Sequence, residues 1–553
     1  MKKRALALLL ALVMMLSLVA CNNDEPVETK PDETKAGISE TKPATPSETQ
    51  APVKIEYPLV KEGEEVTLKG AVVVNSMPSI EDRLVWQAVE EVTGVNLEWE
   101  FVLKETINTY LAGNEWPDFF LTCDNTVIND TLMYDYGILG ERFVNLLDHL
   151  DIMPNFVQFF EDYPEARKAF TESNGEMYEF PALDGMVTAV YVRPYMRTDV
   201  LEEAGLKVPT TIDEFYDCLV KLKEHYGHEG WLYKQSETNS FFPTVFGAFG
   251  PLTEAVFEDD GTGKILFVRS SEQMRLYYEF MNKLYEEKLI HPECFTIDWN
   301  TAYESELAGG YAFLEYAAEA IGKDQLKDGN FEYLTVLPPL TSQYDSTRQV
   351  MGRMGLLSRS GPYLNAESEH VELMCKLFDI MYATEEVVEG SGLHGMSFFY
   401  GIQGKHWDFD DNGTTYTQYW PTDTYSSFGK FQTSEIVFQN AGRGDALAGY
   451  VTSTEGNAQA RALAFVEHVW PYVKDSSEVF PMSFLKFTED EQFVIDQYWS
   501  EIKTYYVEME AKFITGTVDI ATEWDNYLKT LDQMGIADVL EVYQAAYDRW
   551  LSY

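Results

Sequence analysis

The chain has little cysteine for its length, which argues against a disulfide framework. Five cysteines occur among 553 residues, and no two of them form a CxxC pair. Four of the five lie far apart in the body of the chain: Cys123, Cys218, Cys294 and Cys375. The spacing typical of a zinc site is therefore absent, and we expect buried free thiols, although a single disulfide pair stays open.

Positive charge is also scarce. The chain carries 41 Lys and Arg against 91 Asp and Glu, a formal net charge of −50 at pH 7. A surface of this sign repels nucleic acid and anionic lipid headgroups, so neither is expected as a partner. We interpret most of the acidity as a contribution to solubility.

Catalytic signatures are missing as well. The sequence has no GxSxG nucleophile elbow, no HExxH helix and no GxxxxGK[ST] phosphate loop. Two carboxylates that face one cleft can hydrolyse a glycoside at spacings that no sequence reports, so a hydrolase remains an alternative. We predict that the chain is not an enzyme, has no catalytic residues and needs no cofactor.

Long apolar runs are absent except at the amino terminus. Basic residues at positions 2–4 precede the apolar run Ala5–Met15, and small residues follow it. This is the pattern of an export signal, and the run falls short of the ~20 apolar residues of a membrane span. Leu18–Cys21 resembles the lipobox of bacterial lipoproteins, which implies cleavage after residues 1–20 and a lipid anchor on Cys21. An ordinary secretory signal is the alternative.

The segment after Cys21 is predicted to be a disordered tether, over residues 21–56. Asn22–Lys54 contains no aromatic residue, three aliphatic residues, five prolines and three Glu-Thr-Lys units. Such a composition cannot bury a core. As a flexible coil it would span about 30 Å. It would hold a domain on the extracytoplasmic face of the cell membrane.

Beyond the tether, the pattern predicts a strand at Val66–Val74, a helix at Ile80–Thr93 and a strand at Val95–Phe101. A strand, helix and strand in this order form the crossover unit of a parallel sheet. Ligands of such sheets gather at the carboxyl ends of the strands. Asn75–Ser79 lies at one such end and is the first candidate ligand loop.

A second unit follows, with a helix predicted at Glu105–Ala112 and a strand at Asp118–Thr122. Cys123–Asn125 forms the loop at the carboxyl end of that strand and is the second candidate ligand loop. Further strands are predicted at Gly175–Pro181 and Met186–Arg197. A helical stretch follows these strands, and another begins at Thr211, where Thr211–Glu214 has the capping-box signature.

Several segments resemble family 1 extracellular solute-binding proteins, in matching order and spacing along nearly the whole mature chain. Two further segments resemble the large lipoprotein branch of that family, namely Tyr400–Trp407 and Phe513–Tyr527. The segments that resemble the family as a whole are Tyr191–Leu206, Val208–Phe215, Asp260–Ile265, Leu284–Glu293 and Gly309–Leu314.

This resemblance implies an α/β chain with a two-lobed periplasmic-binding-protein-like fold and a ligand cleft between lobes joined by a hinge. The implied first lobe begins at residue 57 and the second at residue 196. The implied division is residues 57–195 for the first part of lobe 1, 196–345 for the first part of lobe 2, 346–400 for the return to lobe 1, and 401–553 for lobe 2 and the C-terminal helices.

The resemblance also implies where a ligand binds, because family members use loops at strand ends, the crossover, and the turn after the Gly-Gly-Tyr segment. A sugar site stacks aromatic rings on the faces of the sugar and places polar groups along its edges. For Glu315 and Asp124 a helix cap or a surface pair is an equal alternative, and for Met77 core packing is favoured. The implied ligand residues are Ser76, Met77, Thr122, Asp124, Asn125, Tyr191, Arg193, Glu315, Tyr316 and Trp407.

No metal site is predicted. His225 and His228 could share a helix face, but no acidic third ligand joins them, and a solvated helix end explains them better. Asp408–Gly413 begins like a calcium loop, yet Tyr419 stands where a bidentate glutamate is required, which favours a hairpin turn at Asn412–Gly413. His225–Trp231 also departs from the calcium loop that many members of the lipoprotein branch carry.

The expectation from the resemblance is a monomeric binding protein that captures a carbohydrate, an oligosaccharide above all, and delivers it to the permease subunits of an ABC importer. Three alternatives remain: a secreted carbohydrate-active enzyme, a binding protein for a solute other than a sugar, and an adhesin with a flat site. The sequence does not identify the sugar.

Overall fold

The computed structural model divides the chain into two compact units, Met1–Ala51 and Pro52–Tyr553, and the description that follows belongs to the second. Cys21 and the predicted tether up to residue 53 lie outside the described residues. The described residues are 54–74, 84–122, 127–183, 194–231, 242–252, 256–309, 311–315, 317–347, 357–359, 361–411, 415–419, 443, 451–453, 456–472 and 480–553.

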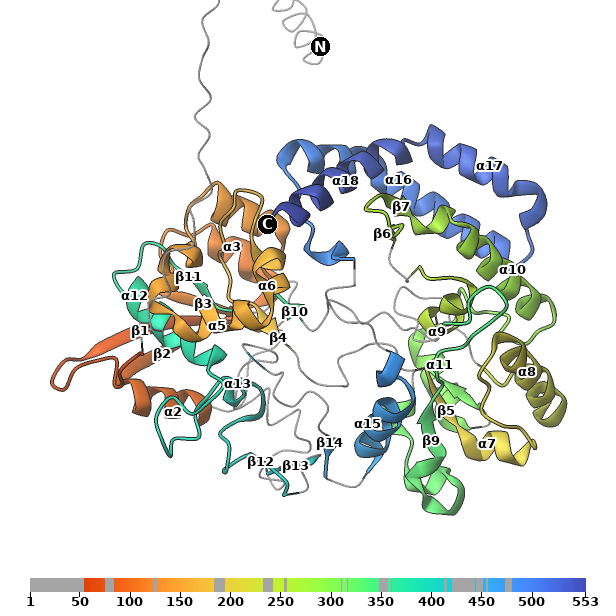
Figure 1. Ribbon diagram of the computed structural model, residues 1–553, viewed down its shortest axis with the longest axis horizontal. Helices are drawn as coiled ribbons and strands as arrows, with labels where there is room; N and C mark the ends of the chain where they lie inside the picture. The colour runs from red at the N-terminus through yellow and green to blue at the C-terminus, as the bar shows by residue number, and fades with distance from the viewer. Residues whose placement is uncertain are drawn as a thin grey trace, which may run out of the picture. The chain divides into compact units, whose positions relative to one another are not determined.

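The first sheet has four strands in the order β11-β3-β1-β2 (Figure 1). β1 (Val66–Val74) pairs in parallel with β2 (Val95–Leu103) and β3 (Phe119–Thr122), whereas β11 (Tyr363–Leu364) joins β3 in antiparallel orientation. Four consecutive residues in the second half of β1 are buried, as expected of a strand with both faces covered. The predicted strand Val66–Val74 is confirmed at both ends.

Helices surround the strands of this first sheet. α2 (Leu84–Thr93) connects β1 to β2 and buries Trp86 against Trp99, with 5.1 Å between the ring centroids. The predicted helix at residues 105–112 is a 3-10 turn followed by α3 (Ile107–Leu111). The other helices between β3 and β4 are α4 (Asp130–Leu132), a π-helical turn (Met133–Ile138), α5 (Pro154–Asp162) and α6 (Pro164–Phe170).

The strand predicted at Gly175–Pro181 is wrong. The segment is irregular, and its amide groups bond to separate partners: Met177 N donates to Asn145 Oδ1 at 3.0 Å and Phe180 N donates to the Pro362 carbonyl at 3.2 Å. The apolar residues that suggested a strand are instead core residues of an extended loop, because Met177, Tyr178 and Phe180 are all buried.

A two-stranded ladder joins two distant segments. β4 (Ala182–Leu183) pairs in antiparallel orientation with β10 (Leu357–Ser358), and Leu183 also forms an isolated bridge with Arg443. Of the strand predicted at Met186–Arg197, the structure describes only the end, β5 (Tyr195–Arg197).

The second main sheet has the order β8-β5-β9 and is antiparallel. β8 (Phe313–Leu314) and β9 (Leu334–Val336) flank β5, and Trp231 adds a parallel bridge to Phe313. The helices in this part of the chain are α7 (Thr198–Glu203), α8 (Ile212–Tyr226), α9 (Phe242–Phe246), α10 (Glu272–Glu286) and α11 (Trp299–Ala308).

α8 begins at Thr211, as its sequence predicts. Thr211 is its N-cap residue and accepts a hydrogen bond from the Glu214 amide at 3.2 Å. Glu214 returns a carboxylate oxygen to the Thr210 amide at 2.8 Å, one residue before the usual capping-box position. The helix ends at Gly227, whose φ of +78° is the left-handed conformation that favours glycine.

Two hairpins are present. β6 (Phe257–Asp259) and β7 (Ile265–Phe267) pair in antiparallel orientation around the segment Asp260–Lys264. β12 (Trp407–Phe409) pairs in the same way with β13 (Thr415–Gln418), which also contacts β14 (Val451–Thr452). The predicted turn at Asn412–Gly413 lies outside the described residues.

The C-terminal segment is helical. α16 (Glu489–Ile514) packs against α10 and α18 (Ile536–Ser552), and α17 (Ile520–Gln533) also contacts α10 (Figure 1). The remaining helices are α12 (Val371–Asp379), α13 (Ser397–Tyr400) and α15 (Asn457–His468). The 3-10 turns are Lys104–Thr106, Leu146–Ile152, Gly247–Phe249, Val268–Ser270, Ala318–Ala320, Lys323–Gln325, Lys327–Gly329, Phe331–Tyr333, Ile380–Tyr382, Trp470–Tyr472 and Met482–Phe484.

The three cysteines that the structure describes are free, buried thiols. Burial raises the pKa of Cys218 to about 11 and the pKa values of Cys294 and Cys375 to about 12, so these thiols stay protonated at neutral pH. Cys123 lies outside the described residues. Across the described helices, none has both the length and the apolar composition needed to cross a membrane.

Candidate ligand-binding site

The first sheet brings together the ends of the two strands that precede the predicted ligand loops. β1 and β3 are parallel neighbours, and their register pairs Val73 with Thr122. The carboxyl ends of both strands therefore lie side by side, where the loops that follow them begin. Thr122 is 1% exposed, and within the described part of the chain its Oγ1 has no hydrogen-bond partner. The loop residues themselves lie outside the described residues: Ser76, Met77, Asp124 and Asn125.

The second sheet likewise brings two strand ends to one edge, beside the predicted ligand residue Glu315. Tyr195 of β5 pairs with Leu314 of β8 and with Val336 of β9, both in antiparallel orientation. The start of β5 and the end of β8 therefore share one edge of the sheet. Glu315 follows β8 directly and is partly buried. Three other predicted residues lie outside the described residues: Tyr191, Arg193 and Tyr316.

The backbone at this edge of the second sheet is hydrogen-bonded to polar side chains that were not predicted from the sequence. Glu306 of α11 is 1% exposed and accepts hydrogen bonds from the amides of Glu315 at 2.9 Å and Ala317 at 2.8 Å. Asn457 of α15 donates to the carbonyls of Ala318 at 2.8 Å and Ile321 at 2.9 Å. The one local signal for Glu306 is its spacing of four from the buried Ala302 on the same helix.

Arg461 extends these contacts to β5. Its guanidinium donates to Asn457 Oδ1 at 2.6 Å and to the Tyr195 hydroxyl at 2.9 Å. Its Cζ also lies 5.1 Å from the centroid of the Tyr195 ring, within the range of a cation–π contact. Nearby, burial and the carboxylates of Glu229 and Glu306 raise the pKa of Tyr311 to about 12, which keeps that phenol protonated.

Trp407 does not line an open surface in this structure. Its side chain is fully buried in a small cluster with aromatic and methionine side chains, and its indole N–H donates to the Gly401 carbonyl at 2.8 Å. A buried ring with a satisfied N–H is typical of core packing. Its predicted role as a ligand contact finds no support in this position.

The two histidines for which a solvated helix end was predicted, rather than a metal site, make local contacts. His228 Nδ1 lies 2.7 Å from the Glu229 carbonyl, and the His228 ring is 5.2 Å from the ring of Tyr311. Within the described ranges, no group of three or more His, Cys, Asp or Glu residues has the geometry to hold a metal ion.

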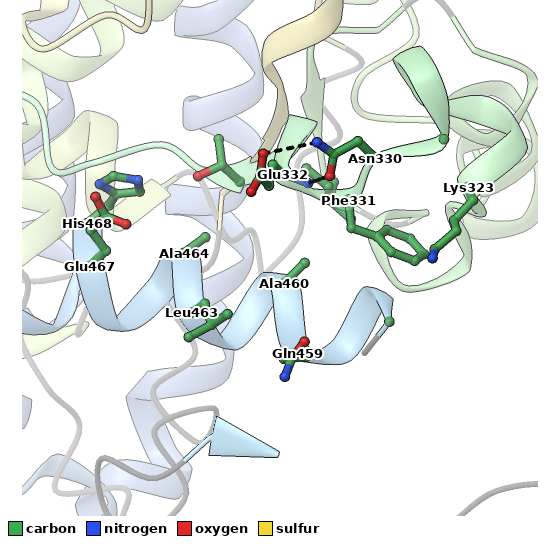
Figure 2. A pocket seen from close by; sticks show the side chains of 14 residues that line it. Lys323, Asn330, Phe331, Glu332, Gln459, Ala460, Leu463, Ala464, Glu467 and His468 are labelled. Carbon is green, nitrogen blue, oxygen red and sulfur yellow. Dashed lines mark hydrogen bonds between the residues drawn. The ribbon is translucent and has the colours of Figure 1, made fainter. Parts of the chain in front are cut away.

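A cavity of about 580 Å³ lies between the segment before β9 and α15 (Figure 2). Figure 2 shows Lys323 beside the ring of Phe331, with 5.6 Å between Nζ and the ring centroid, and Asn330 bonded to Glu332 at 3.0 Å. Glu467 and His468 line its other end. Of the predicted ligand residues that the structure describes, namely Thr122, Glu315 and Trp407, none lines this cavity.

A family comparison adds to this arrangement of two sheets. The family model described as "Bacterial extracellular solute-binding protein" matches residues 76–386, more than half of the chain. The chain belongs to this family. The recognition made from sequence segments is therefore confirmed, and this solute-binding protein acts by binding.

Individual relatives extend the match over most of the chain. The fructooligosaccharide ABC transporter substrate-binding protein FusA of Streptococcus pneumoniae is 23% identical over 496 residues, covering 85% of this chain and 87% of FusA. The structure of FusA in complex with kestose has a TM-score of 0.62 at 21% identity and covers 88% of this solute-binding protein and 99% of that chain.

Two further solved structures share the fold. An HMO-binding, ABC-transporter-associated solute-binding protein from Bifidobacterium longum infantis has a TM-score of 0.66 at 18% identity, over 88% of this chain and 99% of that chain. The alginate-binding protein AlgQ2 without calcium ion has a TM-score of 0.60 at 22% identity, over 89% and 100%. The predicted two-lobed α/β fold is confirmed by these likenesses.

Proposed function

We propose that this solute-binding protein captures an oligosaccharide outside the cell and delivers it to the permease subunits of an ABC importer. The observation that carries the proposal is the length of the match: relatives aligned over 85% or more of this chain carry fructooligosaccharide, HMO and alginate in their names. The paired sheet edges support it, because loops at strand ends are where α/β proteins hold polar ligands.

The chemistry of the predicted residues suits a sugar. Tyr191 and Tyr316 could stack on sugar rings, while Asp124, Arg193 and Glu315 could bond to hydroxyl groups at the ring edges. The lobes would close on the ligand, and the ligand would stabilise the closed form by its higher affinity for that form. We infer no chemical step on the ligand.

The proposal includes a lipid anchor. After removal of residues 1–20, acylated Cys21 would hold the monomeric protein on the extracytoplasmic face of the membrane, with residues 21–56 as a tether. Several acyl chains give stable anchoring where a single chain gives reversible binding. Mass spectrometry of the chain isolated from membranes tests this point, because an unmodified Cys21 would contradict it.

The lobe boundaries are also part of the proposal. Residues 57–195 would begin lobe 1 and residues 196–345 would begin lobe 2, with a return to lobe 1 over 346–400 and lobe 2 with the C-terminal helices over 401–553. The pairing of β11 with β3 and the β4–β10 ladder support a return of the chain near residue 357.

Isothermal titration tests the function. Residues 22–553 are titrated at pH 7.5 with fructooligosaccharides, human milk oligosaccharides, alginate oligosaccharides and a peptide mixture, and the sugars are analysed afterwards. We expect one class of oligosaccharide to bind unchanged with a Kd of about 1 μM or lower, about −8 kcal/mol. Binding of peptide alone, or cleavage of a sugar, would overturn the proposal.

A further inference from the structure

The carboxylate of Glu306 is buried and divided between two backbone amides. Glu306 lies near the end of α11 and is 1% exposed. Oε1 accepts from the amide of Glu315 at 2.9 Å, and Oε2 accepts from the amide of Ala317 at 2.8 Å. Since each oxygen takes a different amide two residues apart, both ends of the short segment 315–317 are fixed to one rigid group.

Such a carboxylate is costly to bury. An ionised group in the interior loses hydration worth several kcal/mol and is tolerated only where hydrogen bonds replace the water. Hydrogen bonds to a charged acceptor are roughly twice as strong as neutral ones. The contacts therefore hold residues 315–317 more firmly than a neutral side chain at position 306 would.

A second side chain, Asn457 of α15, holds the next turn, residues 318–321. Asn457 opens α15, and its Nδ2 donates to the carbonyls of Ala318 at 2.8 Å and Ile321 at 2.9 Å. Arg461, one turn later, donates to Asn457 Oδ1 at 2.6 Å, which fixes the orientation of the Asn457 amide. The side-chain amide of Asn457 therefore links the two ends of the segment 318–321.

The same network reaches the other half of this sheet edge. Arg461 donates to the Tyr195 hydroxyl at 2.9 Å, and Tyr195 begins β5 just after the predicted ligand residues Tyr191 and Arg193. The chain of hydrogen bonds from Ala318 through Asn457 and Arg461 to Tyr195 therefore connects the two segments that carry predicted ligand residues of the second sheet.

We propose that Glu306 and Asn457 are positioning residues for oligosaccharide binding: through the backbone of residues 315 and 317–321 they fix the predicted ligand residue Glu315. The inference rests on the proposed function and adds to it the groups that preorganise the site. A preorganised loop binds more tightly, because it loses less conformational freedom when the ligand arrives.

The test compares Glu306→Gln with a matched control. The side-chain amide of glutamine has one oxygen that can accept a hydrogen bond. Its NH2 group faces a backbone N–H, which also donates, so one of the two hydrogen bonds to the backbone is lost. Asp379→Asn is the control, because Asp379 is likewise a buried carboxylate that accepts from two backbone amides, those of Asn155 at 3.3 Å and Phe156 at 2.8 Å. Among the predicted ligand residues that the structure describes, none is a printed hydrogen-bond partner of Asp379, which bonds to Asn155 and Phe156.

We expect Glu306→Gln to weaken binding of the oligosaccharide found for the wild-type protein by about tenfold, as for a lost hydrogen bond to a charged group. Asp379→Asn should bind within about twofold of wild type. Hydrogen exchange of a peptide spanning residues 313–318 should be faster in Glu306→Gln only. Asn457→Ala serves as a second variant and should weaken binding by a similar factor while leaving the 315 and 317 amides protected.

The outcomes separate the inference from the function on which it rests. If the wild-type protein binds no oligosaccharide, the proposed function fails. If the wild type binds and both Glu306→Gln and Asn457→Ala bind as tightly as Asp379→Asn, the inference is overturned. A Glu306→Gln variant that does not fold leaves Asn457→Ala to decide, and unfolding of both variants would show that the two residues are structural.

Discussion

Asp379 illustrates how a single buried carboxylate replaces a local helix cap. The N-cap residue of α5, Met153, has no side chain that can accept a hydrogen bond. Asp379, at the end of α12, accepts instead from the amides of Asn155 and Phe156 and from Asn155 Nδ2. Burial raises the pKa of Asp379 to about 7, and these hydrogen bonds act against that rise.

The raised pKa gives a prediction for pH. An unfolded Asp has a pKa of about 3.9, below the folded value of about 7. A group with a higher pKa when folded stabilises the fold at low pH, and that contribution is lost as pH rises from about 4 to about 7. The free energy of unfolding of wild type relative to Asp379→Asn should therefore fall over this range, by up to about 4 kcal/mol.

Urea unfolding of both proteins at pH 4.5, 5.5, 6.5 and 7.5 measures this difference, because contributions from the other carboxylates cancel in the comparison. A wild-type stability that rises relative to the variant across this range would show that the hydrogen bonds outweigh burial and that the folded pKa of Asp379 is low.

At the scale of elements, α8 depends on signals inside its own sequence. The Thr211 hydroxyl satisfies the Glu214 amide, one of the four amides that a helix start leaves without partners. Local signals of this kind are visible without a structure, which is why the start of this helix was predicted.

Thr211→Ala should lower the free energy of unfolding by about 1 kcal/mol, the usual value of an N-cap side chain. Thr211→Ser keeps the hydroxyl and should lie within a few tenths of a kcal/mol of wild type. Chemical unfolding monitored by circular dichroism checks both variants. Equal stability of the alanine and serine variants would show that the cap contributes nothing.

Other elements carry no readable local signal. β4 and β10 have two residues each, too short for a period to be recognised, and they pair across more than 170 positions of sequence. The strand predicted at Gly175–Pro181 was wrong for a different reason. The apolar residues of this segment are buried although the segment is a loop, and composition alone does not distinguish a buried loop from a buried strand.

At the scale of the whole molecule, a buried cluster of charges ties distant parts of the second unit together. Glu172 accepts from Lys486 at 2.6 Å and from Arg359 at 3.4 Å, and Arg359 also pairs with Glu179 at 2.8 Å. All four side chains are at most 13% exposed. The C-terminal residue adds to the cluster, because the Tyr553 hydroxyl donates to the Glu172 carbonyl at 3.4 Å.

Removal of one partner should therefore be costly. Lys486→Met leaves the buried Glu172 with only the longer ion pair to Arg359, at 3.4 Å, and we expect the free energy of unfolding to fall by about 3 kcal/mol. Lys512→Met is the matched control, because the Lys512–Glu508 pair is 37% and 60% exposed and should contribute about 0.5 kcal/mol or less. Denaturant unfolding measures both, and equal losses would contradict the prediction.

Sequence and structure each account for part of the candidate site. The sequence placed the loops after β1 and β3 at strand ends, since strand and turn signals extend over a few residues, and the family resemblance implied the turn after β8. It did not identify Glu306, Asn457 or Arg461, whose types are common on exposed helix faces. Trp407 shows the converse limit. Its residue type suggested that it stacks on a sugar ring, whereas in the structure its side chain is buried in a small hydrophobic cluster.

The sequence by itself determined the acidic charge, the mixed α/β character, the first strands and the N-cap of α8, because these features depend on composition or on neighbours within one or two turns. Only the tertiary structure decided which polar groups meet: Glu306 with the amide of Ala317, Asn457 with the carbonyl of Ala318, Lys486 with Glu172. The physical reason is that a buried polar group is stable only with its partner in place, and folding brings in that partner from far along the chain.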